Sequence, residues 1–165
     1  MEYQIIDDFL DQEFFNKIKN NLINKDFPWM YRSSCSYEGG KDGICFTHCF
    51  YNNNESKSSF NKELAPLYKK LKARSLKQSR ANLILKDPEH PQGDFHCDYD
   101  FKENLFTAIL HVTNNNGYTL LGTRSLKKVE CKENRMIIFP VDYLHASGRQ
   151  TDDSQRIVLN VNFYV

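Results

Sequence analysis

A histidine and an aspartate lie two positions apart in the segment GDFHCDYDF, residues 93–101. In an extended chain, residues i and i+2 point to the same side, so His96 and Asp98 could bind one metal ion together while Cys97 points away. Such a site needs a third ligand, and the remaining histidines are the candidates: His48, His90, His111 and His145. Without one, the pair would be a surface histidine and an aspartate that caps a turn.

His145 is the best placed of these candidates. It follows the apolar run NRMIIFP, which predicts a strand that ends at Pro140, and a ligand at the start of the next strand is easily presented to a site. Two histidines and one carboxylate on one face of a metal ion leave its other positions open, which is typical of non-haem Fe(II) oxygenases. We therefore predict a metal site at His96, Asp98 and His145.

A candidate anion-binding residue, Arg156, lies eleven residues after His145 in the segment RIVLNVNFYV. Its alternation predicts a strand with one apolar face, whereas the opposite face carries the arginine and two asparagines. A hairpin between the two segments would bring the guanidinium near the metal, where it could bind the distal end of a small dicarboxylate. Two alternatives remain open: a salt bridge from Arg156 to Asp152 or Asp153, and Arg149 as the anchor.

The segment FTAILHVT, residues 106–113, predicts another strand with a mixed face. Its apolar side chains share one face, and the opposite face carries Thr107, Ile109 and His111. A face exposed to water would favour lysine, glutamate and serine. The mixture of polar and apolar side chains therefore predicts a partly buried polar pocket.

The apolar patterning changes from helical to β along the chain. Residues 7–24 predict an amphipathic helix, capped by one of the aspartates near its start. Residues 61–73 predict a second helix, which Pro66 weakens in its first half. Short strands are expected within residues 27–51 and repeatedly from Arg80 onward, separated by turn-rich segments.

Helices followed by many short strands favour an α+β domain. The length of 165 residues predicts a single domain over residues 1–165. We expect a helical N-terminal part over about residues 1–79 and a β core over about residues 80–165, folded as a sandwich or jelly roll.

Charge and composition restrict the partners and the location. The formal net charge of +1 gives no global field toward nucleic acid or acidic lipid. We find no basic segment followed by an apolar leader, and no apolar run approaches the ~18 residues that a membrane span needs. We therefore expect a cytoplasmic protein without a membrane partner, whose five cysteines are reduced thiols.

Two further polar clusters have simpler explanations. Cys45, His48 and Cys49 are close enough for a zinc site, but no second pair of ligands follows them, so we expect them to pack within a strand. The basic run YKKLKARSLKQSR, residues 68–80, is expected to be an exposed helix face and loop. If it is functional, it could hold nucleic acid or an acidic protein, although no aromatic residues are interleaved for base stacking.

With these positions in view, the chain resembles the Fe(II)- and 2-oxoglutarate-dependent dioxygenases. His96-Cys97-Asp98, His145 and Arg156 resemble the HxD…H…R/K signature of that family. The nearest subgroup is the small prolyl-4-hydroxylase-like oxygenases, including compact ones carried by bacteriophages. The similarity includes the opening segment IIDDFLDQEF and is closest from Arg80 to the end, through TAILHVTNNNGYTLL, NRMIIFPVDYLHAS and QRIVLNVNFY.

The resemblance implies a double-stranded β-helix, or jelly roll, with the N-terminal helices packed on one sheet. It implies Fe(II) held by His96, Asp98 and His145, and 2-oxoglutarate bound to the iron with its far carboxylate on Arg156. Dioxygen would be the oxidant, with ascorbate as an optional reductant. Asp98 implies hydroxylation, because the halogenating relatives lack this carboxylate.

The resemblance also implies cosubstrate contacts at two further positions. His111 stands where many members carry a tyrosine that hydrogen-bonds 2-oxoglutarate, and a hydrogen-bonded core histidine is the alternative. Asn82, on one face of the segment RANLILK, resembles cosubstrate-contacting positions of related oxygenases.

For the substrate, the resemblance implies hydroxylation of a prolyl or other amino-acid side chain, in a peptide, a protein or a free amino acid, with succinate and CO₂ as co-products. One alternative is an oxygenase that acts on nucleic acid and holds it with residues 68–80. Another is a metal-binding jelly-roll interaction module without turnover. A phage-encoded protein would work in the host cytoplasm, and the sequence does not indicate an oligomeric state.

Overall fold

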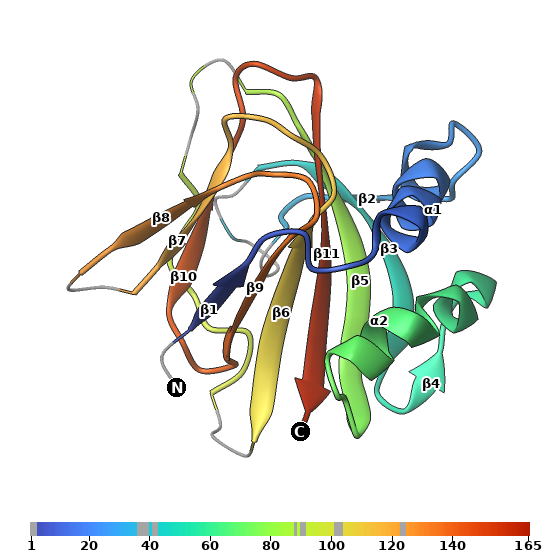
Figure 1. Cartoon of the computed structure of the whole chain (residues 1–165). Coiled ribbons are helices and arrows are strands. Elements are labelled where there is room, and N and C mark those ends of the chain that lie inside the picture. The colour runs from blue at the N-terminus through green and yellow to red at the C-terminus, as the bar shows by residue number, and fades with distance from the viewer. Residues whose placement is uncertain are drawn as a thin grey trace.

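The computed structural model describes residues 3–35, 40, 43–87, 89, 92–100, 104–122 and 125–165. Figure 1 shows how the elements are arranged. In chain order they are β1 (Gln4–Ile6), α1 (Gln12–Ile23), β2 (Met30–Arg32), β3 (Cys45–Asn52), β4 (Glu55–Ser56), the 3-10 helix η1 (Ser59–Leu64), α2 (Ala65–Lys70), β5 (Ser75–Leu85), β6 (Leu105–His111), β7 (Tyr118–Leu121), β8 (Lys127–Glu130), β9 (Arg135–Pro140), β10 (His145–Gly148) and β11 (Gln155–Tyr164).

Two antiparallel sheets and a layer of helices make up the fold. The large sheet has the order β1-β9-β6-β11-β5-β3-β2, with β4 beside β3, and the small sheet has the order β10-β7-β8. Both helices lie on one side of the large sheet, and the small sheet lies on the other (Figure 1). The predicted α+β jelly roll with N-terminal helices on one sheet is confirmed.

The helical layer is held by an apolar core against the outer face of the large sheet. Helix α1 buries Phe15, Ile18 and Leu22 in this core. The alternation of β11 supplies the opposing surface through Ile157, Leu159, Val161 and Phe163. Since each such side chain contributes about 1.5–3 kcal/mol when fully buried, this interface is a major source of stability.

Helix α1 begins later than the predicted residue 7. Residues Gln4–Ile6 instead form β1, which pairs with β9. The Asp11 carboxylate then caps the helix by accepting a hydrogen bond from the backbone N–H of Phe14 at 2.9 Å. The helix begins only where the chain has left the sheet and an N-cap is available.

The second predicted helix, residues 61–73, is replaced by two shorter helical segments, η1 and α2. Pro66 lies at the start of α2, where its missing N–H costs no helical hydrogen bond. The chain leaves α2 at Leu71 and enters β5 at Ser75, so β5 already begins within the basic run. The N-terminal part contains β1 and β4 in addition to β2 and β3, which lie within residues 27–51 where strands were predicted.

The opposite face of the large sheet looks toward the small sheet. A second apolar cluster fills part of the space between them: Ile109, Leu121, Val129, Ile137, Phe139 and Val158. The remaining side chains on this face of β6 and β11 include Thr107, Arg156 and Asn162, all buried. A polar site thus adjoins an apolar core, as the mixed faces predicted.

The cysteines differ from the prediction of reduced thiols throughout. Cys35 and Cys45 form a disulfide with a Cα–Cα distance of 5.8 Å, whereas Cys49, Cys97 and Cys131 are free. Arg32 pairs with Cys45 across β2 and β3, so the chain just after β2 lies beside the start of β3. Strand pairing, rather than sequence spacing, brings the two cysteines together.

Among the described residues, none of the helices has the length and apolar character required to cross a membrane.

Candidate metal centre

His96, Asp98 and His145 lie together between the two sheets. His96 and His145 form an antiparallel bridge in which each backbone N–H donates to the carbonyl of the other residue at 3.0 Å. This pairing places their rings side by side, with centroids 4.4 Å apart. One ligand atom from each of the three residues lies within 4.8 Å of the others, and no comparable group occurs elsewhere in the described part of the chain.

Backbone contacts orient both imidazoles. The Nδ1 of His96 is 3.1 Å from the carbonyl of Asp94, and the Nδ1 of His145 is 3.1 Å from the carbonyl of Tyr143. Because a carbonyl can only accept, each Nδ1 must donate, which leaves the lone pair of each Nε2 available for a metal.

The Asp98 carboxylate is held by two side chains of the large sheet. Its Oδ2 accepts from the Thr107 hydroxyl at 2.6 Å and from the Asn162 amide at 2.8 Å, and that amide also lies 2.9 Å from the Thr107 oxygen. Its Oδ1 lies 3.8 Å from His145 Nε2 and is therefore the oxygen that faces the other candidate ligands. The sequence placed Thr107 and Asn162 on polar faces but gave no sign that they would support a ligand.

Electrostatics favour the protonation states that a metal requires. Burial raises the pKa of Asp98, but the hydrogen bonds from Thr107 and Asn162 and the positive charge of Arg80 oppose it, and the pKa lies below its usual range. Burial lowers the pKa of His145, which keeps the imidazole neutral. A charged carboxylate and a neutral imidazole are the metal-binding forms of these side chains.

Arg156 is buried without an acidic partner. Its Nη1 donates to the Ser147 hydroxyl and to the Gly148 carbonyl, both at 2.9 Å, and its Nη2 lies 3.3 Å from the Thr119 hydroxyl. Its Nε has no partner, and no carboxylate of the described residues pairs with the guanidinium. The side chain is 2% exposed, so this charge is almost completely removed from water.

The structure shows neither of the two alternatives for Arg156 nor the hairpin expected between the segments of His145 and Arg156. Asp152 accepts from the backbone of Asn116 rather than from Arg156. Arg149 donates to the carbonyls of Ile44 and Leu85. Strands β10 and β11 belong to different sheets, so Arg156 reaches β10 across the space between the sheets and not within a hairpin.

A recess connects the candidate metal ligands to Arg156. It is bordered by side chains from both sheets, namely Asn82, Ile84, Ile109, Thr119, His145, Ala146, Ser147, Arg156, Val158 and Asn160, together with Cys35, Arg80 and His96. The side-chain oxygens of Asn82 and Asn160 are buried there without a hydrogen-bond partner. Unpaired buried polar atoms around a recess are suited to a polar ligand.

His111 occupies a different place from the other predicted contacts. It is completely buried beside Arg156 but does not border the recess, whereas Thr119 does. Burial and the nearby charge of Arg156 lower its pKa to about 3, so the ring is neutral. Thr119 lies in the segment TAILHVTNNNGYTLL, which resembles the family, but nothing in the sequence marked it as a residue that lines the recess.

Among the histidines that the structure describes, His48 lies away from this centre. His48 contacts the Pro28 carbonyl at 2.9 Å and the Ser58 hydroxyl at 2.8 Å, and it packs against Phe27 and Phe50. It is therefore a core histidine, as expected for its strand. His90 lies outside the described residues.

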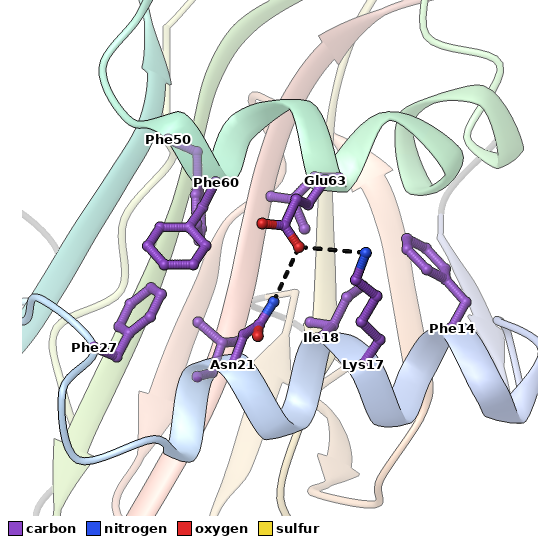
Figure 2. Close-up of a pocket in the computed structure, with 10 residues that line it drawn as sticks. Phe14, Lys17, Ile18, Asn21, Phe27, Phe50, Phe60 and Glu63 are labelled. Carbon is purple, nitrogen blue, oxygen red and sulfur yellow. Dashed lines mark hydrogen bonds and ion pairs between the residues drawn. The ribbon is translucent and has the colours of Figure 1, made fainter.

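A separate hollow lies on the helical side of the large sheet (Figure 2). Phe27, Phe50 and Phe60 form one wall, and Glu63 reaches across to Lys17 at 3.4 Å and to Asn21 at 3.2 Å. Its volume is only about 20 Å³. It contains no group of convergent ligands and is best explained as imperfect packing between α1 and η1.

Solved structures with the same fold include several 2-oxoglutarate oxygenases. A prolyl hydroxylase from Trichoplax adhaerens, in complex with a hypoxia inducible factor peptide fragment, has a TM-score of 0.73 at 10% identity, covering 98% of this chain and 83% of that one. An oxidoreductase of the 2OG-Fe(II) oxygenase family from Burkholderia pseudomallei has a TM-score of 0.70 at 10% identity, covering 98% and 85%.

A third structure shows that this fold accommodates the expected cofactors in another protein. The epimerase SnoN, in complex with Fe3+, alpha ketoglutarate and nogalamycin RO, has a TM-score of 0.65 at 12% identity and covers 98% of this chain and 78% of that one. No protein-family model and no curated protein sequence matches the chain. At these identities the likeness establishes the fold, which is the jelly roll of 2-oxoglutarate oxygenases.

Proposed function

We propose that the protein is an Fe(II)- and 2-oxoglutarate-dependent dioxygenase that hydroxylates a C–H bond. One observation carries the proposal: a single recess is bordered both by the candidate ligands His96 and His145 and by the buried guanidinium of Arg156, which has no acidic partner among the described residues. A buried charge without a counter-charge is costly, so the recess favours an anionic ligand.

The side chains of the centre and the recess fit both Fe(II) and 2-oxoglutarate. Two imidazole Nε2 atoms and one carboxylate oxygen match the donor set of non-haem iron. Arg156 would hold the far carboxylate of 2-oxoglutarate, supported by Thr119 and Ser147, and Asn82 supplies a further polar contact. His111 is neutral behind Arg156 and would add no charge to the recess.

When bound, iron and 2-oxoglutarate would supply the oxidising chemistry, in which one atom of O₂ enters the substrate as a hydroxyl and the other enters succinate as CO₂ leaves. The protein's part is to orient these groups and to restrict water. Asn162 and Thr107 keep the Asp98 carboxylate in place, and the apolar cluster around Ile109 closes one side of the recess. Ascorbate would act only as an external reductant.

For the substrate, we propose a prolyl or other amino-acid side chain in a peptide or as a free amino acid. The bound peptide fragment of the Trichoplax adhaerens prolyl hydroxylase supports this choice by likeness of fold. Nucleic acid is the less favoured alternative, and a module that binds metal without turnover is the other.

The test begins with binding under anaerobic conditions. We expect Mn(II) to raise the melting temperature of the wild-type protein but not that of the His96→Ala variant. Arg156→Met should bind Mn(II) normally and lose about 1.5–3 kcal/mol of 2-oxoglutarate affinity, the contribution of hydrogen bonds to a charged group. Arg149→Met is the matched control and should keep the cosubstrate affinity, because its guanidinium binds backbone carbonyls outside the recess.

Addition of oxygen to the Fe(II)-loaded protein with 2-oxoglutarate should then release succinate. No effect of Mn(II) on wild-type stability would reject the metal site. Binding of both groups without any succinate, with and without a panel of peptides, would favour the binding module.

A further inference from the structure

A further hollow, the outer hollow, also borders the candidate metal ligands His96 and Asp98. It is bordered by Gln78, Arg80, His96, Cys97, Asp98, Tyr99 and Asn162. Its volume is about 230 Å³, compared with about 50 Å³ for the recess at Arg156. A group in this outer hollow would lie beside the metal while 2-oxoglutarate occupied the recess, so this is where a substrate group fits.

Arg80 borders both the recess and the outer hollow. It lies on the same face of β5 as Gln78 and Asn82, because alternate residues of a strand share a face. Its Nη2 donates to the Cys35 carbonyl at 3.1 Å. The other N–H groups of the guanidinium have no partner within the part of the chain that the structure describes.

Two more cations lie around the outer hollow. The Lys77 ammonium lies 5.7 Å from the centre of the Tyr99 ring, which itself borders the outer hollow. Arg32 is close enough to Arg80 for their charges to interact, and it is exposed. Neither Lys77 nor Arg32 forms an ion pair with any described acidic residue. The negative charges of Asp100 and Asp142 act instead on Cys97, which also borders the outer hollow.

The carboxylate that borders the outer hollow cannot neutralise the charge of Arg80. Asp98 accepts hydrogen bonds from Thr107 and Asn162 on one oxygen and presents the other to the metal position. A divalent metal with one carboxylate ligand, a bound dicarboxylate and Arg156 would together be close to neutral. Among the described residues, Arg80 would therefore have no ion-pair partner in the loaded protein.

We infer that the substrate of the proposed oxygenase carries a carboxylate group that binds Arg80 in the outer hollow. This inference rests on the proposed function, since it assumes that metal and 2-oxoglutarate occupy the centre. A guanidinium binds a carboxylate through two parallel hydrogen bonds, which fix orientation as well as position. The bond from Arg80 to the Cys35 carbonyl holds the guanidinium in place before the substrate arrives.

The test compares acids with their amides. Protein loaded with Mn(II) and saturated with 2-oxoglutarate under nitrogen would be mixed with N-acetyl-L-proline or N-acetyl-L-prolinamide, and with the corresponding leucine pair. Line broadening of the probe by the bound Mn(II) in proton NMR would report binding near the metal. We expect each acid to bind at least about tenfold more tightly than its amide, as for other charge-assisted hydrogen bonds.

Variants assign the difference to Arg80. Arg80→Gln should weaken binding of the acid about ten- to a hundredfold and leave binding of the amide unchanged. Lys69→Gln, which removes one positive charge from the exposed end of α2, should bind like the wild type. The Mn(II) affinity and the melting temperature of Arg80→Gln confirm that the centre is intact, and the acid–amide comparison on the wild type decides the question even if this variant does not fold.

The outcomes distinguish a failure of the proposed function from a failure of the proposed carboxylate site at Arg80. Failure of the wild type to bind Mn(II) or 2-oxoglutarate overturns the proposed function. Equal binding of acid and amide by a protein that holds both groups overturns only the role of Arg80. Displacement of the acid by an equal concentration of inorganic phosphate would overturn the assignment to a carboxylate.

Discussion

Asn162 connects the candidate metal ligand Asp98 to the large sheet. Its amide donates to Asp98 Oδ2 and lies within hydrogen-bonding distance of Thr107, with which it also pairs across β11 and β6. The carboxylate is therefore attached to two strands that form the rigid middle of the sheet. Residues that orient a metal ligand in this way typically change metal affinity about 10–100-fold when they are removed.

We expect Asn162→Leu to bind Mn(II) about 10–100-fold more weakly, because the Asp98 carboxylate loses one of its two donors. Isothermal titration of the metal-free protein with Mn(II) measures this change. Asn160→Leu is the matched control two positions away, and it borders the recess without contacting Asp98. A loss of affinity in Asn160→Leu that equals the loss in Asn162→Leu would contradict this role.

His111 predicts a specific acid sensitivity. Its pKa is lowered to about 3 by burial and by Arg156, whereas an unfolded histidine titrates near pH 6.5. As the pH falls below about 6.5 the unfolded chain takes up the proton first, so the neutral histidine contributes stability at neutral pH that is lost toward pH 3. The loss is at most about 1.4 kcal/mol per pH unit in this window.

Replacement of His111 should remove its contribution to the pH dependence of the free energy of unfolding. In metal-free solutions containing a chelator, urea unfolding of His111→Leu should lose stability less steeply than the wild type between pH 6.5 and about 4.5. Other titrating groups such as Asp98 are present in both proteins and cancel in the comparison. Parallel stability curves would show that His111 is not neutral and buried in the folded state.

The sequence predicted which residues meet at the centre better than it predicted their neighbours. Strand alternation predicted the face of Arg156 on β11. His96 and Asp98 lie outside the named strands, and the bridge between His96 and His145 places the first of them beside β10. The sequence could not predict that Thr119 borders the recess whereas His111 does not. This difference depends on how far the Arg156 side chain extends between the sheets, which no local pattern encodes.

At the scale of elements, β1 and the loop before β9 determine where the first helix can begin. Asn134 has a positive φ of 59° and is buried, and its side chain bonds to both the backbone N–H and the carbonyl of Leu10. The sequence pattern extended the helix through residues 7–11 because a helix and this connection share apolar spacing. The contact between Asn134 and Leu10 favours the connection over the helix, and the local sequence gives no indication of this contact.

The disulfide attaches the segment after β2 to β3 beside the recess, through Cys35 and Cys45. Closing a loop with a sequence separation of 10 residues should contribute about 2–3 kcal/mol to stability in the loop-entropy description. We expect protein purified without reductant to show three reactive thiols in denaturant, Cys49, Cys97 and Cys131, and all five after reduction.

A variant makes the thiol measurement specific. Cys35→Ser should expose one additional thiol, that of Cys45, and should lower the midpoint of urea unfolding of the non-reduced protein. Cys97→Ser is the matched control, because it removes a free thiol and should leave the disulfide intact. Five reactive thiols in the non-reduced wild type would restore the original prediction of reduced cysteines.

For the whole molecule, the alternation of apolar residues and the order of the segments predicted the jelly roll. The sequence did not predict which strands belong to which sheet. The polar faces of β6 and β11 identified the interior of the jelly roll in advance. The placement of β10 in the small sheet was not predictable from its proximity to β11 in sequence, since a hairpin is the simpler local solution. Packing of the two apolar clusters on opposite faces of the large sheet favours the observed arrangement.

The fold also divides the basic run at residues 68–80 between two sides of the large sheet. Lys69 and Lys70 are exposed at the end of α2 in the helical layer, whereas Arg80 faces the centre on the opposite side. Nucleic-acid affinity depends on several cations that contact phosphates at once. With a formal net charge of +1, the molecule has no general field that would compensate for this division.

We therefore expect no nucleic-acid binding tighter than the non-specific range of about 10⁻⁴–10⁻⁶ M at physiological salt. Fluorescence anisotropy of labelled single-stranded and duplex 20-mers, measured at 50 and 200 mM salt, tests this. A fall in affinity of about 10³-fold or more across that range would indicate many phosphate contacts and would favour the nucleic-acid oxygenase instead. The double variant Lys69→Gln, Lys70→Gln decides where such contacts lie: it would abolish them if α2 formed the binding surface, and would leave them if the cations around Arg80 did.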